Sequence, residues 1–181
     1  MAERKFGKVL FTEEQISKRA KEIAAQIDKD YEGEEVILLC TLKGSIMWIG
    51  DIMKHLTVDT RLDFISASSY GSSTTSSGVV KIKFDPEINM YNANVIVVED
   101  IVDTGNTLKY VLAKLQERGP KSIKVCTMLN KESRRTADFH ADYVGFEIDD
   151  LFVIGYGLDF DQKYRDLPYI SYLEEDDIDK L

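Results

Sequence analysis

Short apolar runs constrain the fold of this chain more than any other feature of its sequence. Val36–Cys40 and Asn94–Val98 are runs of mostly branched apolar residues, and Ser122–Leu129 is a further candidate strand. A strand that is apolar at successive positions is buried on both faces, which is typical of a parallel sheet. Helical patterns lie between these runs, so we expect an α/β fold with a mostly parallel twisted sheet flanked by helices.

The remaining elements are predicted from periodicity and turn signals. Residues 12–27 carry apolar side chains on one helical stripe, and Thr12 with Gln15 is typical of a capping box. We also expect helices at residues 46–56 and 107–117. Further strands are expected at residues 61–67, 79–84, 143–146 and 152–155, the first two forming a hairpin around the polar loop 68–78.

Composition limits the classes of function. A chain of 181 residues with 44% hydrophobic and 30% charged residues suits one globular domain, which we assign to residues 1–181. A net charge of −9 disfavours broad binding of nucleic acid or anionic lipid, but it allows a local phosphate site. Cys40 and Cys126 lie in apolar runs and are expected to be buried free thiols. We find neither a signal peptide nor an apolar run of bilayer length, so we expect a cytoplasmic protein.

The strongest functional signal is V-I-V-V-E-D-I-V-D-T-G-N-T-L at residues 95–108. A strand delivers the adjacent carboxylates of Glu99 and Asp100 to its carboxyl end, and Asp103 follows them. Threonine hydroxyls and backbone N–H groups at the start of the next helix are typical of a phosphate cradle. The paired carboxylates suit a sugar diol, held directly or through a hard cation. A capped helix with solvated acidic residues is the alternative, which this density of polar groups disfavours.

This segment resembles the phosphoribosyl pyrophosphate signature of the type I phosphoribosyltransferases and fills every position of that pattern. The resemblance extends from Leu10 to Tyr169, and it implies a small hood built from the chain ends beside the main sheet. The implied activity joins a base to the ribose 5-phosphate of phosphoribosyl pyrophosphate with Mg²⁺. The implied ligands of the phosphoribosyl group and its 5′-phosphate are Glu99, Asp100, Asp103, Thr104, Gly105, Asn106 and Thr107.

A second segment, T-L-K-G-S at residues 41–45, is similar to the pyrophosphate loop of the same family. Lys43 and Gly44 are therefore implied to bind pyrophosphate. In the family, the peptide before the glycine is often a non-proline cis bond, here Leu42–Lys43 or Lys43–Gly44. Taken alone, this segment is an ordinary turn between a strand and a helix.

A third segment, S-Y-G-S-S-T-T-S-S-G at residues 69–78, resembles the flexible catalytic loop, with Ser69 and Tyr70 at its start. The loop is expected to close over bound pyrophosphate and keep water from the reacting sugar. Taken alone, it is a hairpin tip without function.

Base specificity is implied by L-F-V-I-G-Y-G-L-D-F-D-Q-K-Y-R-D-L at residues 151–167, which is similar to a segment of the hypoxanthine-guanine branch. That branch implies that Lys131 donates to the purine 6-oxo group, that Phe152 stacks on the base and that the Val153 backbone reads its edge. An ammonium group only donates, so Lys131 favours a 6-oxo acceptor over the 6-amino donor of adenine. Taken singly, Lys131 is a surface lysine and Phe152 a core residue; their joint spacing favours the site.

Further roles fall to four acidic residues and one arginine. Arg165 is implied to contact pyrophosphate, or taken alone to form a rim salt bridge. The implied magnesium ligands are Glu99, Asp100 and Asp159. Asp103 is the candidate general base that takes the proton from purine N7 as N9 attacks, or it forms a hydrogen bond to N7.

Several alternatives stay open. The first is a phosphoribosyltransferase for xanthine, adenine or a pyrimidine; Lys131 with Phe152 disfavours adenine, whereas xanthine shares the 6-oxo group. The second is a nucleic-acid-binding regulator that senses phosphoribosyl pyrophosphate, which the lack of a basic surface disfavours. The third is a nucleotide-binding protein without turnover. The resemblance also implies a homodimer or homotetramer, and exposed apolar residues of the second helix, such as Trp48, are candidates for its interface.

Overall fold

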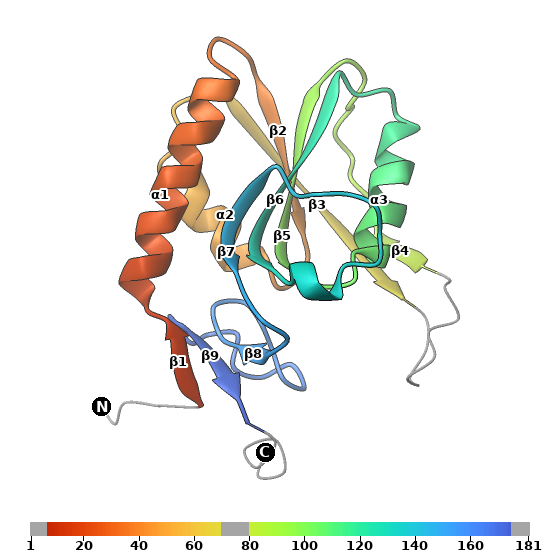
Figure 1. The fold of residues 1–181 in the computed structure, drawn as a ribbon. Coiled ribbons are helices and arrows are strands. Elements are labelled where there is room, and N and C mark those ends of the chain that lie inside the picture. Colours follow the sequence, from red (N-terminus) through yellow and green to blue (C-terminus); the bar gives the residue numbers. More distant parts are fainter. Residues whose placement is uncertain (1–6, 70–79, 175–181) are drawn as a thin grey trace.

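The computed structural model describes residues 7–69 and 80–174. Its main element is a six-stranded sheet (Figure 1). All neighbouring strands in this sheet are parallel except one pair at an edge, which forms an antiparallel hairpin. In sheet order, the strands are β4 (Val80–Phe84), β3 (Thr60–Ser69), β2 (Val36–Thr41), β5 (Asn94–Val102), β6 (Ser122–Asn130) and β7 (Tyr143–Glu147).

Helices cover both faces of this sheet. The helices α1 (Glu13–Asp30) and α2 (Ile46–Met53) lie on one face, and α3 (Asn106–Gln116) lies on the other (Figure 1). Successive side chains of a strand point to opposite faces. In β2, Leu38 accordingly packs into the core with α1 and α2, whereas Ile37 and Leu39 pack into the core with α3. The apolar runs are therefore strands buried on both faces, and the predicted α/β fold is confirmed.

A second, smaller sheet has three antiparallel strands, in the order β1 (Lys8–Phe11), β9 (Ile170–Leu173) and β8 (Phe152–Ile154). Its strands β1 and β9 come from the two ends of the described chain, as the predicted hood requires. Figure 1 shows this sheet beyond the carboxyl ends of β2 and β5. Neither β1 nor β9 is predicted individually, because each has only four residues and weak alternation.

Several bounds differ from the expected ones. The α2 helix ends at Met53 rather than at residue 56. The strand β5 continues to Val102, so the adjacent carboxylates lie within the strand rather than after it. A 3₁₀ turn, η1 (Glu132–Arg134), follows β6 and was not expected. The predicted capping box of α1 is present, with both reciprocal hydrogen bonds between Thr12 and Gln15.

The expectation that Trp48 is exposed is wrong, because its side chain is fully buried in the core with α1. Almost every residue of α2 is apolar, so its pattern does not identify the buried face. The exposed apolar surface of α2 belongs instead to Ile46 and Met47. Cys40 and Cys126 are buried free thiols, as predicted. In the part of the chain that the structure describes, no helix has the length and apolar character needed to cross a membrane.

Candidate active site

The segment with the strongest functional signal lines a cavity of about 260 Å³ at the carboxyl ends of β2, β3 and β5. Residues 41–44, at the end of β2 and in the loop after it, form one wall. Residues 99–108 form another wall without interruption. Parallel strands end at the same edge of a sheet, and ligands of α/β proteins bind beyond that edge. The structure thus brings all seven predicted phosphoribosyl ligands together with Lys43 and Gly44.

The start of α3 is suited to a phosphate group. Gly105 is the residue before the helix; its φ of 80° is readily adopted only by glycine, and no side chain caps the helix there. The first N–H groups of a helix have no partners within it, and the helix dipole adds partial positive charge. Both features face the cavity that Asn106 and Thr107 line.

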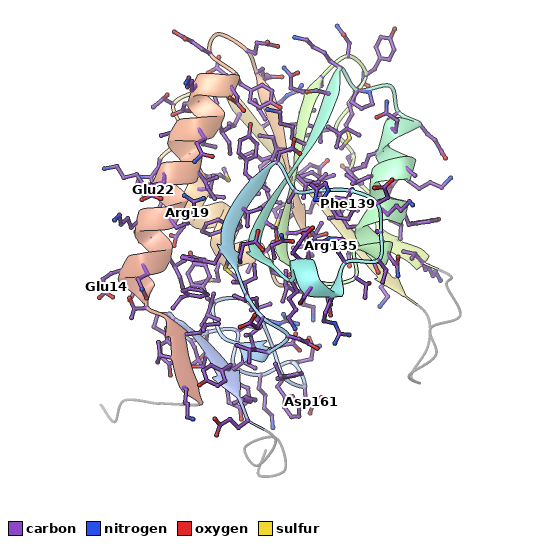
Figure 2. The ribbon with its side chains drawn as sticks, in the orientation of Figure 1. Glu14, Arg19, Glu22, Arg135, Phe139 and Asp161 are labelled. Atoms are coloured by element: carbon purple, nitrogen blue, oxygen red, sulfur yellow. The ribbon has the colours of Figure 1, made fainter. Side chains whose placement is uncertain are left out.

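The loop before α3 rests on Arg135, a residue to which the sequence analysis gives no role. Arg135 Nη1 donates to the carbonyl oxygen of Asp103 at 3.0 Å. The guanidinium lies 4.8 Å from the centre of the Phe139 ring, and Figure 2 shows the two side chains together near α3. A methyl group at Gly105 would collide with Phe139. The loop is therefore held by contacts with Arg135 and Phe139. The only signal in the sequence is the arginine pair that follows Lys131.

Glu99 and Asp100 form a partly buried pair of carboxylates at the cavity. Burial raises the pKa of Glu99, and the adjacent charge of Asp100 raises it further. Burial also raises the pKa of Asp100, against the effect of the Ile101 backbone N–H that donates to it. Thr41 Oγ1 donates to Glu99 Oε2 at 2.6 Å, a contact that the sequence analysis missed. Two carboxylates in this setting are suited to a cation or to donor hydroxyls.

The loop at residues 41–45 packs directly against these carboxylates. A methyl group at Gly44 would overlap the carboxylate of Asp100. The peptide between Leu42 and Lys43 is cis, so the first of the two predicted positions is confirmed. On the other side of the loop, a methyl group at Gly157 would collide with the Gly44 carbonyl oxygen. The connection that follows β8 therefore covers the loop at backbone contact distance.

Lys43 and Arg165, the two cations predicted to bind pyrophosphate, lie close together where these segments pack. Lys43 Nζ donates to Gln162 Oε1 at 3.0 Å, and Arg165 Nη2 donates to the same oxygen at 3.4 Å. Arg165 is also held by the Gly157 carbonyl oxygen at 2.7 Å. The two cations thus converge on one acceptor. Gln162 was not predicted as a site residue, because no motif in the sequence marks it as the shared acceptor of Lys43 and Arg165.

The third predicted magnesium ligand, Asp159, lies near but apart from the carboxylate pair. Its Oδ1 atom is 2.7 Å from Arg165 Nη2. Its negative charge contributes to the raised pKa of Asp100, after the burial of that carboxyl group. Among residues 7–69 and 80–174, no three His, Cys, Asp or Glu side chains are close enough to hold a metal ion. The role of Asp159 in holding a second magnesium stays a prediction.

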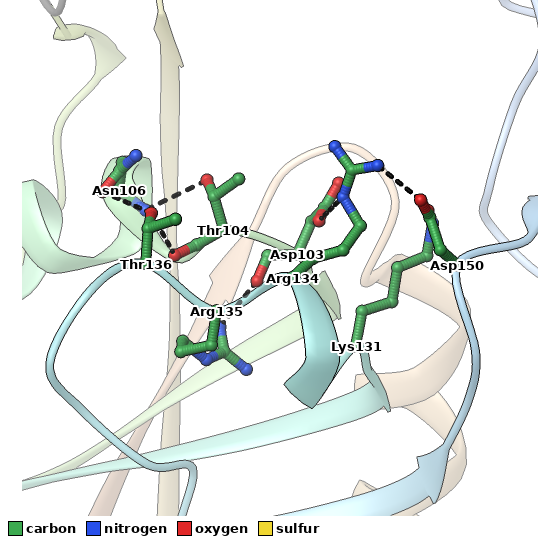
Figure 3. A network of polar contacts seen from close by, with 8 residues as sticks. All are labelled: Asp103, Thr104, Asn106, Lys131, Arg134, Arg135, Thr136 and Asp150. Atoms are coloured by element: carbon green, nitrogen blue, oxygen red, sulfur yellow. Dashed lines mark hydrogen bonds and ion pairs between the residues drawn. The ribbon is translucent and has the colours of Figure 1, made fainter.

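Lys131 directly follows β6, beside the loop that connects β5 to α3. Its backbone N–H donates to the carbonyl oxygen of Val102 at 2.9 Å. Its side chain is only 9% exposed, and its ammonium donates to Asp150 at 3.3 Å. Arg134 forms ion pairs with both Asp150 and Asp103 (Figure 3). The structure thus links Lys131 to Asp103 through two residues without a predicted role.

The other predicted purine residues are in β8. Phe152 is 44% exposed and packs edge-on against Phe160, with ring centres 5.7 Å apart. Val153 is buried and pairs with Tyr172 of β9. Neither lines the cavity described above. Their roles stay predictions.

The predicted flexible loop begins at the end of β3. Ser69 is the last residue of that strand, but its side chain lies outside the described part of the chain, as does Tyr70. Their roles in loop closure also stay predictions.

Comparison with known proteins places the chain in a family. Residues 8–161 match the phosphoribosyl transferase domain. The chain belongs to the phosphoribosyltransferase family.

Individual relatives extend the match over nearly the whole chain. A hypoxanthine-guanine phosphoribosyltransferase of Bacillus subtilis is 44% identical, over 92% of this chain and 93% of the relative. A crystal structure of a hypoxanthine-guanine phosphoribosyltransferase from Bacillus anthracis is 45% identical, with a TM-score of 0.90 over 94% of this chain and 100% of that one. A hypoxanthine phosphoribosyltransferase from Staphylococcus aureus is 43% identical, with a TM-score of 0.91 over 94% of this chain and 93% of that one.

Proposed function

We propose that this protein is a hypoxanthine-guanine phosphoribosyltransferase of purine salvage. It converts hypoxanthine or guanine and phosphoribosyl pyrophosphate to IMP or GMP and pyrophosphate. The observation that carries the proposal is the uninterrupted lining of one cavity by residues 99–108, with Lys131 at the neighbouring strand end. The full-length relatives named above support the choice of base.

In this proposal, the phosphoribosyl group lies along the wall formed by residues 99–107. The N-terminus of α3 and the hydroxyls of Thr104 and Thr107 bind the 5′-phosphate. Glu99 and Asp100 accept hydrogen bonds from the ribose hydroxyls or hold them through a cation. Lys43, Arg165 and the backbone N–H of Gly44 bind pyrophosphate, on which negative charge grows as its bond to the anomeric carbon breaks.

Magnesium fits the carboxylate pair. Two adjacent, partly buried carboxylates with raised pKa values are a donor set that a hard divalent cation favours. Glu99 and Asp100 would hold one ion and Asp159 would help to hold a second, beside pyrophosphate. Bound there, magnesium supplies neutralising charge for the phosphate oxygens.

The purine lies between β8 and Lys131 in this proposal. Lys131 donates to the 6-oxo oxygen, Phe152 stacks on the ring through its exposed face, and the Val153 backbone reads the base edge. As N9 forms its bond to the anomeric carbon, the N7 proton passes to Asp103 or stays in a hydrogen bond to it. Asp103→Asn distinguishes these roles: loss of a base lowers kcat far more than it raises KM for phosphoribosyl pyrophosphate.

A spectrophotometric assay tests the proposal directly. The protein is incubated with phosphoribosyl pyrophosphate, magnesium and, in parallel, hypoxanthine, guanine, xanthine or adenine. We expect turnover of hypoxanthine and guanine and little turnover of adenine. Turnover of adenine or xanthine alone would contradict the purine assignments and retain the phosphoribosyl site. A folded protein without turnover of any base would contradict the proposed activity. The homodimer or homotetramer and the cytoplasmic location stay predictions.

A further inference from the structure

Four charged side chains form a line across the site, between the ends of β5 and β6 (Figure 3). Lys131 Nζ donates to Asp150 Oδ1 at 3.3 Å. Arg134 Nη1 donates to Asp150 Oδ2 at 2.6 Å. Arg134 Nε lies 2.8 Å from Asp103 Oδ1. The charges alternate, and the two ends of the line are the residues assigned above to the purine 6-oxo and N7 positions.

We propose that the two middle residues, Asp150 and Arg134, position the end groups for purine recognition. Asp150 sets the position of the Lys131 ammonium. Arg134 sets the orientation of the Asp103 carboxylate. The inference rests on the proposed function, because it concerns the same purine.

Asp150 is the partner of a buried lysine side chain, that of Lys131. A lysine side chain that is 9% exposed needs a partner for its charge, and the Asp150 carboxylate supplies it. The lysine stem has several rotatable bonds, so an ammonium without an anchor samples many positions. An ammonium has three donors, so a bond to Asp150 leaves others for an incoming oxygen. The 52% exposed Asp150 side chain is itself held by Arg134, whose hydrogen bond keeps the pKa of Asp150 below its ordinary value.

Arg134 contacts one carboxylate oxygen of Asp103. Asp103 Oδ1 is buried and, within the part of the chain described, accepts no aligned hydrogen bond. The nearby Arg134 Nε pairs with it through charge. The Asp103 side chain as a whole is 42% exposed, so its carboxylate is restrained at one oxygen while the group stays accessible. A restrained carboxylate that remains accessible is what a contact to purine N7 requires.

The test compares single variants of the full chain by steady-state kinetics with hypoxanthine and phosphoribosyl pyrophosphate. Asp150→Asn keeps the size of the side chain and removes its charge, and Asp150→Glu restores the charge. Arg134→Gln removes the pairing with Asp103. Asp85→Asn is the matched control, because Asp85 is 59% exposed and pairs with Arg118 outside the cavity. Each variant is also melted, so that a change in stability is seen separately.

We expect Asp150→Asn to raise KM for hypoxanthine about tenfold, as is typical for residues of one ionic network, and to leave KM for phosphoribosyl pyrophosphate within about twofold. Asp150→Glu recovers most of the loss. Arg134→Gln lowers kcat about tenfold, and the double variant loses less than the product of the single losses. Asp85→Asn matches the wild type.

The inference is overturned if Asp150→Asn leaves KM for hypoxanthine unchanged. It is equally overturned if both KM values and Tm change together, because that result indicates a merely structural role. Absence of turnover in the wild type contradicts the proposed function instead, so the two failures are distinguishable.

Discussion

Substitution of Gly157 by alanine probes the backbone contact between the connection after β8 and the loop at residues 41–45. The new methyl group would lie closer than 3.0 Å to the Gly44 carbonyl oxygen and 3.0 Å from its carbon, whereas ordinary contact begins at 3.4 Å. Neither atom belongs to a flexible side chain, so the two backbones must separate by on the order of 1 Å. Gly157 also has a φ of 97°, which an alanine adopts only with strain.

Gly33→Ala provides the control for that strain. Gly33 has a φ of 76°, but a methyl group there would meet no atom within 4 Å. The positive φ costs each variant about 1 kcal/mol. The collision adds a further ~1–3 kcal/mol to Gly157→Ala alone. For a chain of this size, the difference corresponds to a Tm that is lower by roughly 2–12 °C in Gly157→Ala than in Gly33→Ala.

The functional effect follows from the displacement of Gly44, whose carbonyl is in contact with Gly157 and whose Cα faces Asp100. A misplacement of about 1 Å in a catalytic site lowers the rate by about a hundredfold. We therefore expect kcat/KM for phosphoribosyl pyrophosphate to fall about a hundredfold in Gly157→Ala and less than about twofold in Gly33→Ala. Thermal melting and initial-rate assays measure both effects. Equal losses of activity in the two variants would refute the contact argument and leave only a general effect of positive φ.

Three further predictions test the core and the site. The side chain of Glu99→Gln cannot ionise. Burial raises the pKa of Glu99 above 4.5, so the wild type loses stability as the pH rises through that raised value. Without magnesium, the Tm of the variant should therefore exceed that of the wild type by more at about pH 9 than at about pH 5. Trp48→Ala should lower the free energy of unfolding, measured with urea, by about 3–5 kcal/mol. Met47→Ala, at an exposed position of the same helix, should lower it by about 0.5 kcal/mol or less. Similar losses in the two variants would contradict the burial of Trp48. Arg135→Lys keeps the charge but loses the planar guanidinium that donates to the Asp103 carbonyl oxygen, so KM for phosphoribosyl pyrophosphate should rise several-fold. An unchanged KM would contradict the role of Arg135 in holding the loop before α3.

The parallel sheet and its cavity edge are predictable because their signals are local. An apolar run such as Val36–Cys40 reports burial on both faces, and the motif at residues 95–108 carries its polar groups in one continuous segment. The exposed face of α2 is not predictable in this way. Trp48 lies in a helix that is apolar on nearly all sides, so only the packing against α1 decides which side is buried.

Residues that act through distant partners are also missed by the sequence analysis. Asp150 meets Arg134 only because the connection after β7 folds back toward η1. Gln162 meets Lys43 only because the connection after β8 folds back onto the loop after β2. The sequence separation within each pair does not predict the contact, because tertiary packing and not the period of a helix or strand brings the two residues together.

Close contacts explain why the connection between β8 and β9 forms part of the candidate site. A methyl group at Gly44 would overlap the Asp100 carboxylate, and a methyl group at Gly157 would overlap the Gly44 carbonyl oxygen, so three segments far apart in the sequence pack closely at this point. Arg165, bonded to the Gly157 carbonyl, is carried into this stack and faces the same acceptor as Lys43. In the proposed function, α3 and its loop would still bind the 5′-phosphate without this stack, but Arg165 and the cover over the loop after β2 would be absent. In the proposed reaction, binding of the pyrophosphate leaving group, as opposed to binding of the 5′-phosphate, therefore depends on the contact between the connection after β8 and the loop after β2.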